Sequence, residues 1–299
     1  MKKVRCLGFF FAAASAVFYG VQPALIRVTY DGGSNGITMT FLRSILALPF
    51  LFLLVRQQGE TLRLDSGDFR RILILGAAGS ASTTILLYSS YAYIPTGVAT
   101  TLHFIYPLLV TVGCAVFLRE KLTVPKIFAL ILSTAGIACF MGKDASFHPT
   151  GLALALLSGV CYAFFAVYMS TSGLKRYHHF KLAFYMCAVV GGCAGLFGAA
   201  TGQLTFDLTP KAWLFSLLVA LCVGIAANSL FQLGIRYAGP SNTAILSTLE
   251  PITSVVVGCL LLGEGMTGQK LLGCVCIFSG VILITLAGEK HPESQKAAG

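Results

Sequence analysis

One pattern of residues occurs twice in this chain, 144 positions apart, as the pair Pro107 and Pro251 shows. The stretch 93–136 recurs at 237–280, and the residues that are identical in both copies are, in the first, Tyr93, Leu102, Pro107, Val112, Leu118, Glu120, Thr123, Lys126 and Gly136. An earlier stretch repeats too, since 15–20 reads Ser-Ala-Val-Phe-Tyr-Gly and 158–163 reads Ser-Gly-Val-Cys-Tyr-Ala. A fixed repeat means that one structural unit is used twice. We therefore expect two similar halves.

Composition places both copies in a lipid bilayer. Of the 299 residues, 56% are hydrophobic and 11% are charged, and the mean hydropathy is +0.82, whereas soluble domains carry about 25% charged residues. A helix needs about 20 apolar residues to cross a bilayer. Ten such spans are predicted, at 7–28, 36–55, 71–93, 98–118, 125–142, 150–170, 182–201, 212–236, 243–262 and 269–287. The predicted fold class is an all-α integral membrane protein with ten transmembrane helices.

The first span also has the form of a secretory signal peptide, because Lys2, Lys3 and Arg5 precede an Ala-rich apolar run. Its repeat partner is the span at 150–170, and a removable leader would have no such partner. We therefore interpret 7–28 as a transmembrane helix.

Positive charge sets the orientation, because short cytoplasmic loops carry an excess of Lys and Arg. With the N-terminus inside, the cations that fall outside are only Arg27, Lys143, Lys211 and Lys270. Both termini are therefore predicted to be cytoplasmic. Five helices per half is an odd number, so the second copy crosses in the opposite sense and the halves form an inverted repeat.

The predicted units are a first repeat at 1–142, a second repeat at 150–288 and a cytoplasmic tail at 289–299. The net charge of +10 does not predict a nucleic-acid partner, because the cations lie in short loops rather than in one basic surface. The ten cysteines are scattered and are interpreted as packing residues. No metal-ligand spacing, paired carboxylates or nucleophile beside a base is present, so we predict no metal, no cofactor and no catalytic residue.

Polar residues inside the spans are informative, because a bilayer makes them costly. In the ninth span Thr243, Ser247, Glu250 and Ser254 share one helix face. Similar stripes occur in five other spans: Thr100, His103 and Tyr106 in the fourth, Ser80, Thr84, Tyr88 and Tyr91 in the third, Asn228 and Gln232 in the eighth, Ser15, Tyr19 and Gln22 in the first, and Ser158 and Tyr162 in the sixth. We expect these six helices to line a cavity, and spans five and ten to face lipid or a partner subunit.

Ten residues are candidates for binding a substrate: Glu250, His103, Tyr106, Asn228, Gln232, Ser247, Tyr19, Tyr88, Tyr162 and Arg43. Glu250 is also the candidate for coupling to a proton. Each has a structural alternative. Glu250, His103, Tyr106, Asn228 and Gln232 could form hydrogen bonds between helices instead. The Arg43 side chain could extend to the membrane surface. Tyr19, Tyr88 and Tyr162 could serve only to pack helices together.

The duplicated residues resemble the motifs of a known family. The run Thr-Leu-His-Phe-Ile-Tyr-Pro ending at Pro107, followed by Leu118-Arg-Glu120, and its copy Leu249-Glu-Pro251, followed by Leu262-Gly-Glu264, are similar to the two EamA domains of drug/metabolite transporters. The resemblance implies ten helices, alternating access around a central cavity and, frequently, export of amino acids or other small metabolites across the bacterial inner membrane. The copies differ at Tyr106 and Glu250, which puts the distinctive charge on the ninth span.

The predicted function is therefore a secondary transporter, an exporter or exchanger of small polar metabolites, in which two five-helix halves rock about the cavity. The predicted partners are a small-molecule substrate and the lipid bilayer, with a homodimer as a possibility. Two alternatives stay open. One is a proton-coupled exporter of lipophilic or cationic drugs, for which a single membrane carboxylate suffices. The other is an integral-membrane enzyme or a scaffold, which would not need matched polar stripes in six helices.

Overall fold

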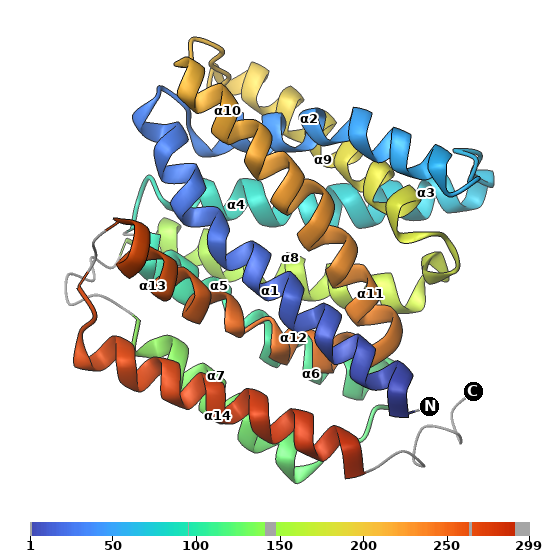
Figure 1. Ribbon diagram of the computed structural model, residues 1–299, viewed down its shortest axis with the longest axis vertical. Coiled ribbons are helices and arrows are strands. Elements are labelled where there is room, and N and C mark those ends of the chain that lie inside the picture. The colour runs from blue at the N-terminus through green and yellow to red at the C-terminus, as the bar shows by residue number, and fades with distance from the viewer. Residues whose placement is uncertain (1, 95, 141–147, 263–264, 291–299) are drawn as a thin grey trace.

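The computed structural model of the protein describes residues 2–94, 96–140, 148–262 and 265–290, and every regular element in them is a helix (Figure 1). The elements are α1 (Lys2–Asp31), α2 (Gly36–Gln57), α3 (Ser66–Ile74), η1 (Leu75–Ala81), α4 (Ser82–Ser90), α5 (Thr96–His103), α6 (Tyr106–Phe117), α7 (Val124–Ala138), α8 (Pro149–Thr171), η2 (Leu174–Arg176), α9 (His179–Thr201), α10 (Pro210–Val219), η3 (Ala220–Ala227), α11 (Asn228–Ala238), α12 (Pro240–Leu246), α13 (Leu249–Leu262) and α14 (Gly268–Lys290).

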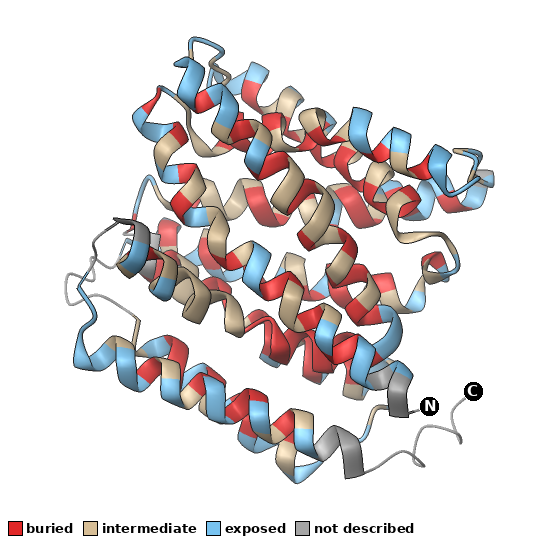
Figure 2. Ribbon diagram, viewed as in Figure 1, coloured by how far each residue is buried: buried red, intermediate tan, exposed pale blue. Residues whose placement is uncertain are grey.

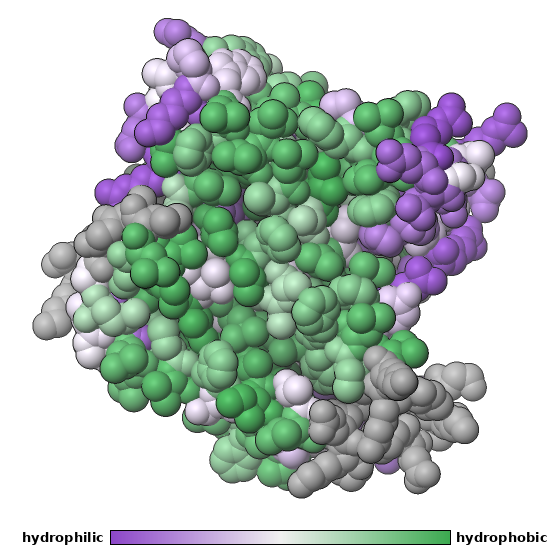
Figure 3. Space-filling model, viewed as in Figure 1, coloured by the Kyte–Doolittle hydropathy of each residue, from purple (hydrophilic) through white to green (hydrophobic). Residues whose placement is uncertain are grey.

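Nine helical stretches within the described residues are long and apolar enough to cross a membrane, and α7 is a shorter apolar helix in the place of the fifth predicted span. The apolar surface forms a broad band across the molecule, with polar residues gathered at its two ends (Figure 3). The predicted all-α membrane fold is confirmed. We call the end at which α1 begins the amino end. The unit boundaries at 142, 150 and 288 stay a prediction, and 141–147 and the tail at 291–299 lie outside the described residues.

Proline breaks the fourth and ninth spans at matched positions. Because Pro has no N–H and its ring clashes with the carbonyl group four residues earlier, Pro107 interrupts the helix after His103, and Pro251 does so after Leu246. The chain resumes as α6 at Tyr106 and as α13 at Leu249. Each span is therefore two helices.

The third and eighth spans contain matched π-helical segments, η1 and η3. A π-helical segment is rare and is frequent at functional sites. Both segments hold a glycine at a helix contact: a Cβ atom on Gly79 would lie 2.9 Å from the Cβ atom of Phe165, and one on Gly224 would lie 2.9 Å from the carbonyl oxygen of Arg43. Neither segment contains proline, so the sequence carried no helix-breaking signal for them.

The two repeats exchange their first helices. α1 packs against α10, η3 and α11 and against α12 and α13, all from the second repeat, and Figure 1 shows it lying between α11 and α13. In the same way α8 packs against η1, α4, α5 and α6 from the first repeat. The two repeats are therefore interlocked in two helix groups: the α1 group, built around α1, and the α8 group, built around α8. The helices α2 and α9 pack on each other and join the groups.

The helices α7 and α14 form a peripheral pair. Glycine allows their close approach, because a Cβ atom on Gly136 would lie 2.7 Å from the carbonyl oxygen of Gly273, and one on Gly280 would lie 2.8 Å from that of Ala129. Their outer sides are apolar and exposed, for example at Phe128 and Phe278, while the buried residues gather inside the molecule (Figure 2). This position agrees with the expectation that spans five and ten face lipid or a partner subunit.

Candidate substrate cavity

A central cavity lies between the α1 group and the α8 group. Its volume is about 120 Å³. All the predicted binding residues except Ser247 line it: Glu250, His103, Tyr106, Asn228, Gln232, Tyr19, Tyr88, Tyr162 and Arg43. The structure therefore brings together residues that come from seven different spans.

The lining differs from the prediction in two respects. Helices α2 and α9 contribute to it as well as the six predicted spans, and α9 does so through Met186, Cys187 and Val190. These side chains are apolar or nearly so, and an apolar residue in an apolar span gives no signal that it faces a cavity. Ser247 is buried at the break between α12 and α13, where its hydroxyl group donates to the carbonyl oxygen of Thr243 at 2.9 Å.

One wall of the cavity is aromatic. The rings of Tyr106 and Tyr162 meet edge to face with their centroids 4.6 Å apart, and Tyr162 stacks on Phe165 at 5.7 Å. The ring of His103 lies 5.3 Å from Tyr106. Tyr162 also contacts Phe231 of α11 at 5.6 Å, so this wall spans both helix groups. Such a surface can pack against a flat or apolar part of a ligand.

Hydrogen bonds fix several of the polar lining residues. Tyr19 on α1 donates to Asn228 Oδ1 on α11 at 2.5 Å, which ties α1 to the second repeat. Gln22 Nε2 donates to the Tyr88 hydroxyl group at 3.3 Å, and this bond joins the two helix groups. These contacts agree with the alternative interhelical role of Asn228, and they also hold the side chains at the cavity wall.

The hydrogen bonds of His103 define its tautomer. Its Nδ1 atom lies 2.9 Å from Ser158 Oγ, and that hydroxyl group donates its only proton to the carbonyl oxygen of Ala155 at 2.6 Å. Ser158 must therefore accept from Nδ1–H, so a neutral His103 carries its proton on Nδ1 and has Nε2 as its acceptor. Nε2 has no hydrogen-bond partner among the described residues.

Two opposite charges remain in the cavity. Glu250 lies in the first turn of α13 and is partly buried, and no described residue forms a hydrogen bond or ion pair with its carboxyl group. Arg43 donates to Thr84 Oγ1 at 3.3 Å and forms no ion pair within the described residues. Gln232 is 4% exposed, and its Oε1 atom has no partner. These three groups are free to bind a ligand.

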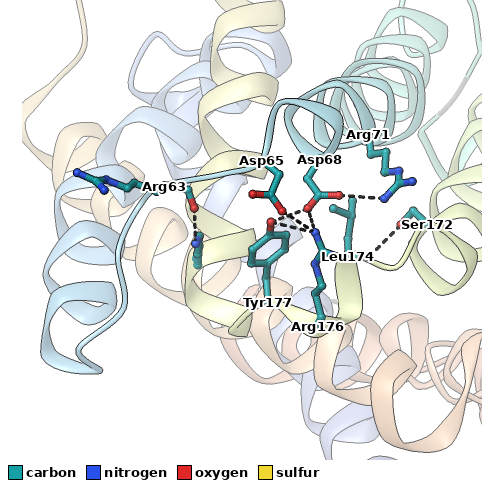
Figure 4. A network of polar contacts seen from close by, with 9 residues as sticks. Arg63, Asp65, Asp68, Arg71, Ser172, Leu174, Arg176 and Tyr177 are labelled. Atoms are coloured by element: carbon teal, nitrogen blue, oxygen red, sulfur yellow. Dashed lines mark hydrogen bonds and ion pairs between the residues drawn. The ribbon is translucent and has the colours of Figure 1, made fainter.

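A polar cluster at the amino end was not foreseen from the sequence (Figure 4). Arg176, after α8, donates to Asp68 and to Asp65 in and before α3, and the Tyr177 hydroxyl group donates to Asp68 at 2.5 Å. Arg71 adds a bond to Asp68 at 3.0 Å. The cluster fixes the turn between α8 and α9 to the first repeat. In the sequence these residues lie between the predicted spans or at the start of one, where isolated charges are ordinary, so their convergence had no sequence signal.

Comparison with known proteins agrees with this architecture. An uncharacterized transporter of Archaeoglobus fulgidus is 24% identical over 93% of this chain and 97% of its own length, and an uncharacterized transporter of Synechocystis is 24% identical over 95% and 94%. Protein PecM of Dickeya dadantii is 24% identical over 72% of this chain and 73% of its own.

One solved crystal structure shares the fold, with a TM-score of 0.83 and 16% identity over 94% of this chain and 98% of the other. The model of the EamA-like transporter family matches residues 6–142 and 149–286. Together these two matches account for both repeats. The chain therefore belongs to the EamA-like transporter family and is a multi-pass membrane transporter.

Proposed function

We propose that this protein exports or exchanges small zwitterionic metabolites such as amino acids across the bacterial inner membrane by alternating access. The observation that carries the proposal is the presence of an unpaired carboxyl group, Glu250, and a guanidinium group without an ion-pair partner, Arg43, in one cavity. A charged group inside a membrane costs free energy, and such groups pair with one another or mark a transport pathway. A ligand with both an ammonium and a carboxylate group satisfies both residues at once.

Glu250 is also the proposed coupling residue. Because one side chain cannot bind an ammonium group and a proton together, protonation of Glu250 would release the substrate and substrate binding would release the proton. Rocking of the α1 group against the α8 group would expose the site to each side in turn. In this proposal the amino end is cytoplasmic, as the distribution of positive charge predicts.

The second candidate function is proton-coupled export of lipophilic cations. It is favoured by the aromatic wall of Tyr106, Tyr162 and Phe165 beside a carboxyl group, because aromatic faces attract cations. Arg43 opposes it, since a guanidinium group in the cavity repels a cation and has no role in its binding. The charge of Arg43 therefore separates the two proposals.

Counterflow into proteoliposomes tests the choice. Liposomes loaded with unlabelled amino acids are diluted into a uniformly ¹⁴C-labelled mixture of protein amino acids, and a parallel set uses labelled tetraphenylphosphonium. We expect exchange of amino acids, loss of it in Arg43→Gln and in Glu250→Gln, and no exchange of tetraphenylphosphonium. Uptake of the cation that Arg43→Gln increases and Glu250→Gln abolishes would instead establish the second function. Absence of both activities would contradict both proposals.

A further inference from the structure

A second, much smaller cavity of about 10 Å³ lies at the amino end, between the turn that follows α8 and the helix α11, and in this conformation it has room for about one water molecule. We call it the seam pocket, and its polar lining residues are Lys175, Tyr177, His179, Gln232 and Arg236. Gln232 lines both this pocket and the central cavity. Gln232 is therefore the lining residue that the seam pocket shares with the proposed substrate site.

The seam pocket lies where the two helix groups meet. Lys175 follows α8, and its turn is fixed to α3 by the bonds of Arg176 and Tyr177 to Asp68 (Figure 4). Gln232 and Arg236 belong to α11, which packs on α1. A movement of the α1 group against the α8 group would therefore widen or close this pocket. The bonds of Arg176 and Tyr177 to Asp68 would hold the Lys175 side of the pocket in place.

The charges of the pocket favour an anion. Lys175 and Arg236 are both lining residues, and none of the lining residues is acidic. Lys175 Nζ donates only to Ser170 Oγ, at 3.4 Å, and Arg236 lies over the ring of Tyr237 at 5.7 Å. Neither cation forms an ion pair within the described residues. Asp68, close by, is already bonded to Arg176, Arg71 and Tyr177.

Gln232 supplies the complementary group. Its side chain is 4% exposed, and its Oε1 atom is buried without a hydrogen-bond partner. A buried polar atom without a partner costs free energy, so it marks a place where a donor arrives in another state. An ammonium group is such a donor. The pocket thus offers two cations for a carboxylate, and Gln232 offers a buried acceptor for an ammonium group.

We propose that the seam pocket, closed in this conformation, opens when the two helix groups separate and becomes the loading site through which a carboxylate-bearing zwitterion enters from the amino end, with its carboxylate held by Lys175 and Arg236 and its ammonium group received by Gln232. This inference rests on the proposed function and names the route to the same cavity. Positive potential at an entrance raises the local concentration and the association rate of an anionic group, and it does so on one side of the membrane only.

Sided transport tests the route. Inside-out membrane vesicles are given the ¹⁴C-labelled amino-acid mixture at low concentration, and right-side-out vesicles are given the same mixture. In the double variant Lys175→Gln and Arg236→Gln, we expect the initial rate from the amino end to fall roughly three- to ten-fold and its dependence on salt to flatten, with entry from the other side unchanged. The matched control is Arg70→Gln, an exposed cation at the same end that lies outside the pocket. A double variant that behaves like Arg70→Gln, or that loses transport equally from both sides, would overturn the proposal.

An anionic lipid headgroup has the same charge as the substrate carboxylate, so the transport assay is repeated in liposomes of phosphatidylcholine alone. A loading site keeps its effect there. An effect that requires added phosphatidylglycerol would assign the two cations to lipid binding instead and would overturn the proposal.

A thiol-labelling assay makes the test independent of the transported substrate. Leu233→Cys places a thiol group in the pocket lining, and its rates of reaction with the anionic sulfonatoethyl and the cationic trimethylammonioethyl methanethiosulfonates report the local potential, after subtraction of the rates of protein without this cysteine. We expect the anionic-to-cationic ratio to fall roughly five-fold when Lys175 and Arg236 are both replaced by Gln. An unchanged ratio would contradict the proposed anion site even if amino acids are transported. A changed ratio without amino-acid transport would support the anion site and contradict the proposed function.

Discussion

Gly20 sets how closely α1 approaches α13, and its replacement tests the exchange of first helices between the repeats. A Cβ atom on Gly20 would lie 2.5 Å from the Cβ atom of Thr253 and 2.6 Å from the carbonyl oxygen of Glu250. Ordinary contacts between such atoms are about 3.5 Å. In Gly20→Ala the two helices must therefore separate by roughly 1 Å, and the proposed coupling residue moves with α13.

The expected magnitude is the difference between two effects. Overpacking of a close contact costs about 1–3 kcal/mol, whereas replacing Gly by Ala inside a helix gains about 1 kcal/mol. Gly20→Ala should therefore destabilise the protein by up to about 2 kcal/mol. The control is Gly192→Ala in α9, where an added Cβ atom meets nothing within 4 Å. Only the gain applies there, so this variant should be slightly more stable than the wild type.

Thermal unfolding in detergent, followed by the reaction of buried cysteines with a thiol-reactive fluorophore, measures both variants. We expect opposite shifts of the midpoint, down for Gly20→Ala and up for Gly192→Ala, and weaker amino-acid exchange in Gly20→Ala because Glu250 is displaced. If both variants were stabilised to the same extent, α1 would not lie on α13 as described, and the interlocked arrangement of the repeats would be refuted.

Two further predictions concern the ends of the molecule. Asp68→Asn should lower the unfolding temperature, because Asp68 is buried and accepts hydrogen bonds from Arg176 and Tyr177. Asp65→Asn should change this temperature little, because the Asp65 side chain is 82% exposed. Equal shifts would show that the cluster does not depend on the buried carboxylate. For orientation, Gly268→Cys should react with an impermeant maleimide added outside intact cells, and a cysteine at Arg70 should not; the reverse pattern would contradict the predicted topology.

The bilayer explains how much could be predicted. Because a chain in lipid must bond its backbone internally, apolar stretches of sufficient length become helices, and because polar side chains avoid lipid, residues such as His103, Asn228 and Glu250 were identifiable as cavity residues. Pro107 and Pro251 likewise indicated where two helices weaken. These predictions required only the local sequence.

The remaining features depend on contacts between distant segments. The π-helical segments carry only small and apolar residues of ordinary type, Met186 and Val190 differ in no way from residues that face lipid, and Asp68 is recognisable as a buried acceptor only once Arg176 is placed beside it. The exchange of α1 and α8 between the repeats is also absent from the local pattern, because helix periodicity specifies which face is polar but not which neighbour that face meets.

The two repeats build the same backbone and then place different chemistry on it. Pro107 and Pro251 each create a helix start within a span, and the residue directly before the proline stands in the first turn of the new helix. A helix N-terminus favours a negative charge. Only the second copy places a carboxyl group, Glu250, there, while the first copy places Tyr106. In the proposed mechanism the two repeats move symmetrically against each other, and the single residue Glu250 provides the coupling.

This asymmetry leads to a last prediction, on His103 and Glu250. Both line one cavity, from helices of different groups, and His103 presents an Nε2 atom without a described partner. If the two side chains bind one zwitterion or share one proton, then His103→Ala and Glu250→Gln should weaken the same step. Measured as affinity for the amino-acid mixture, the loss in the double variant should be clearly smaller than the sum of the two single losses in free energy. Glu250→Gln combined with Arg70→Gln is the control and should be additive. Additive losses for His103 and Glu250 as well would mean that His103 acts through its bond to Ser158, as a structural residue of the α8 group.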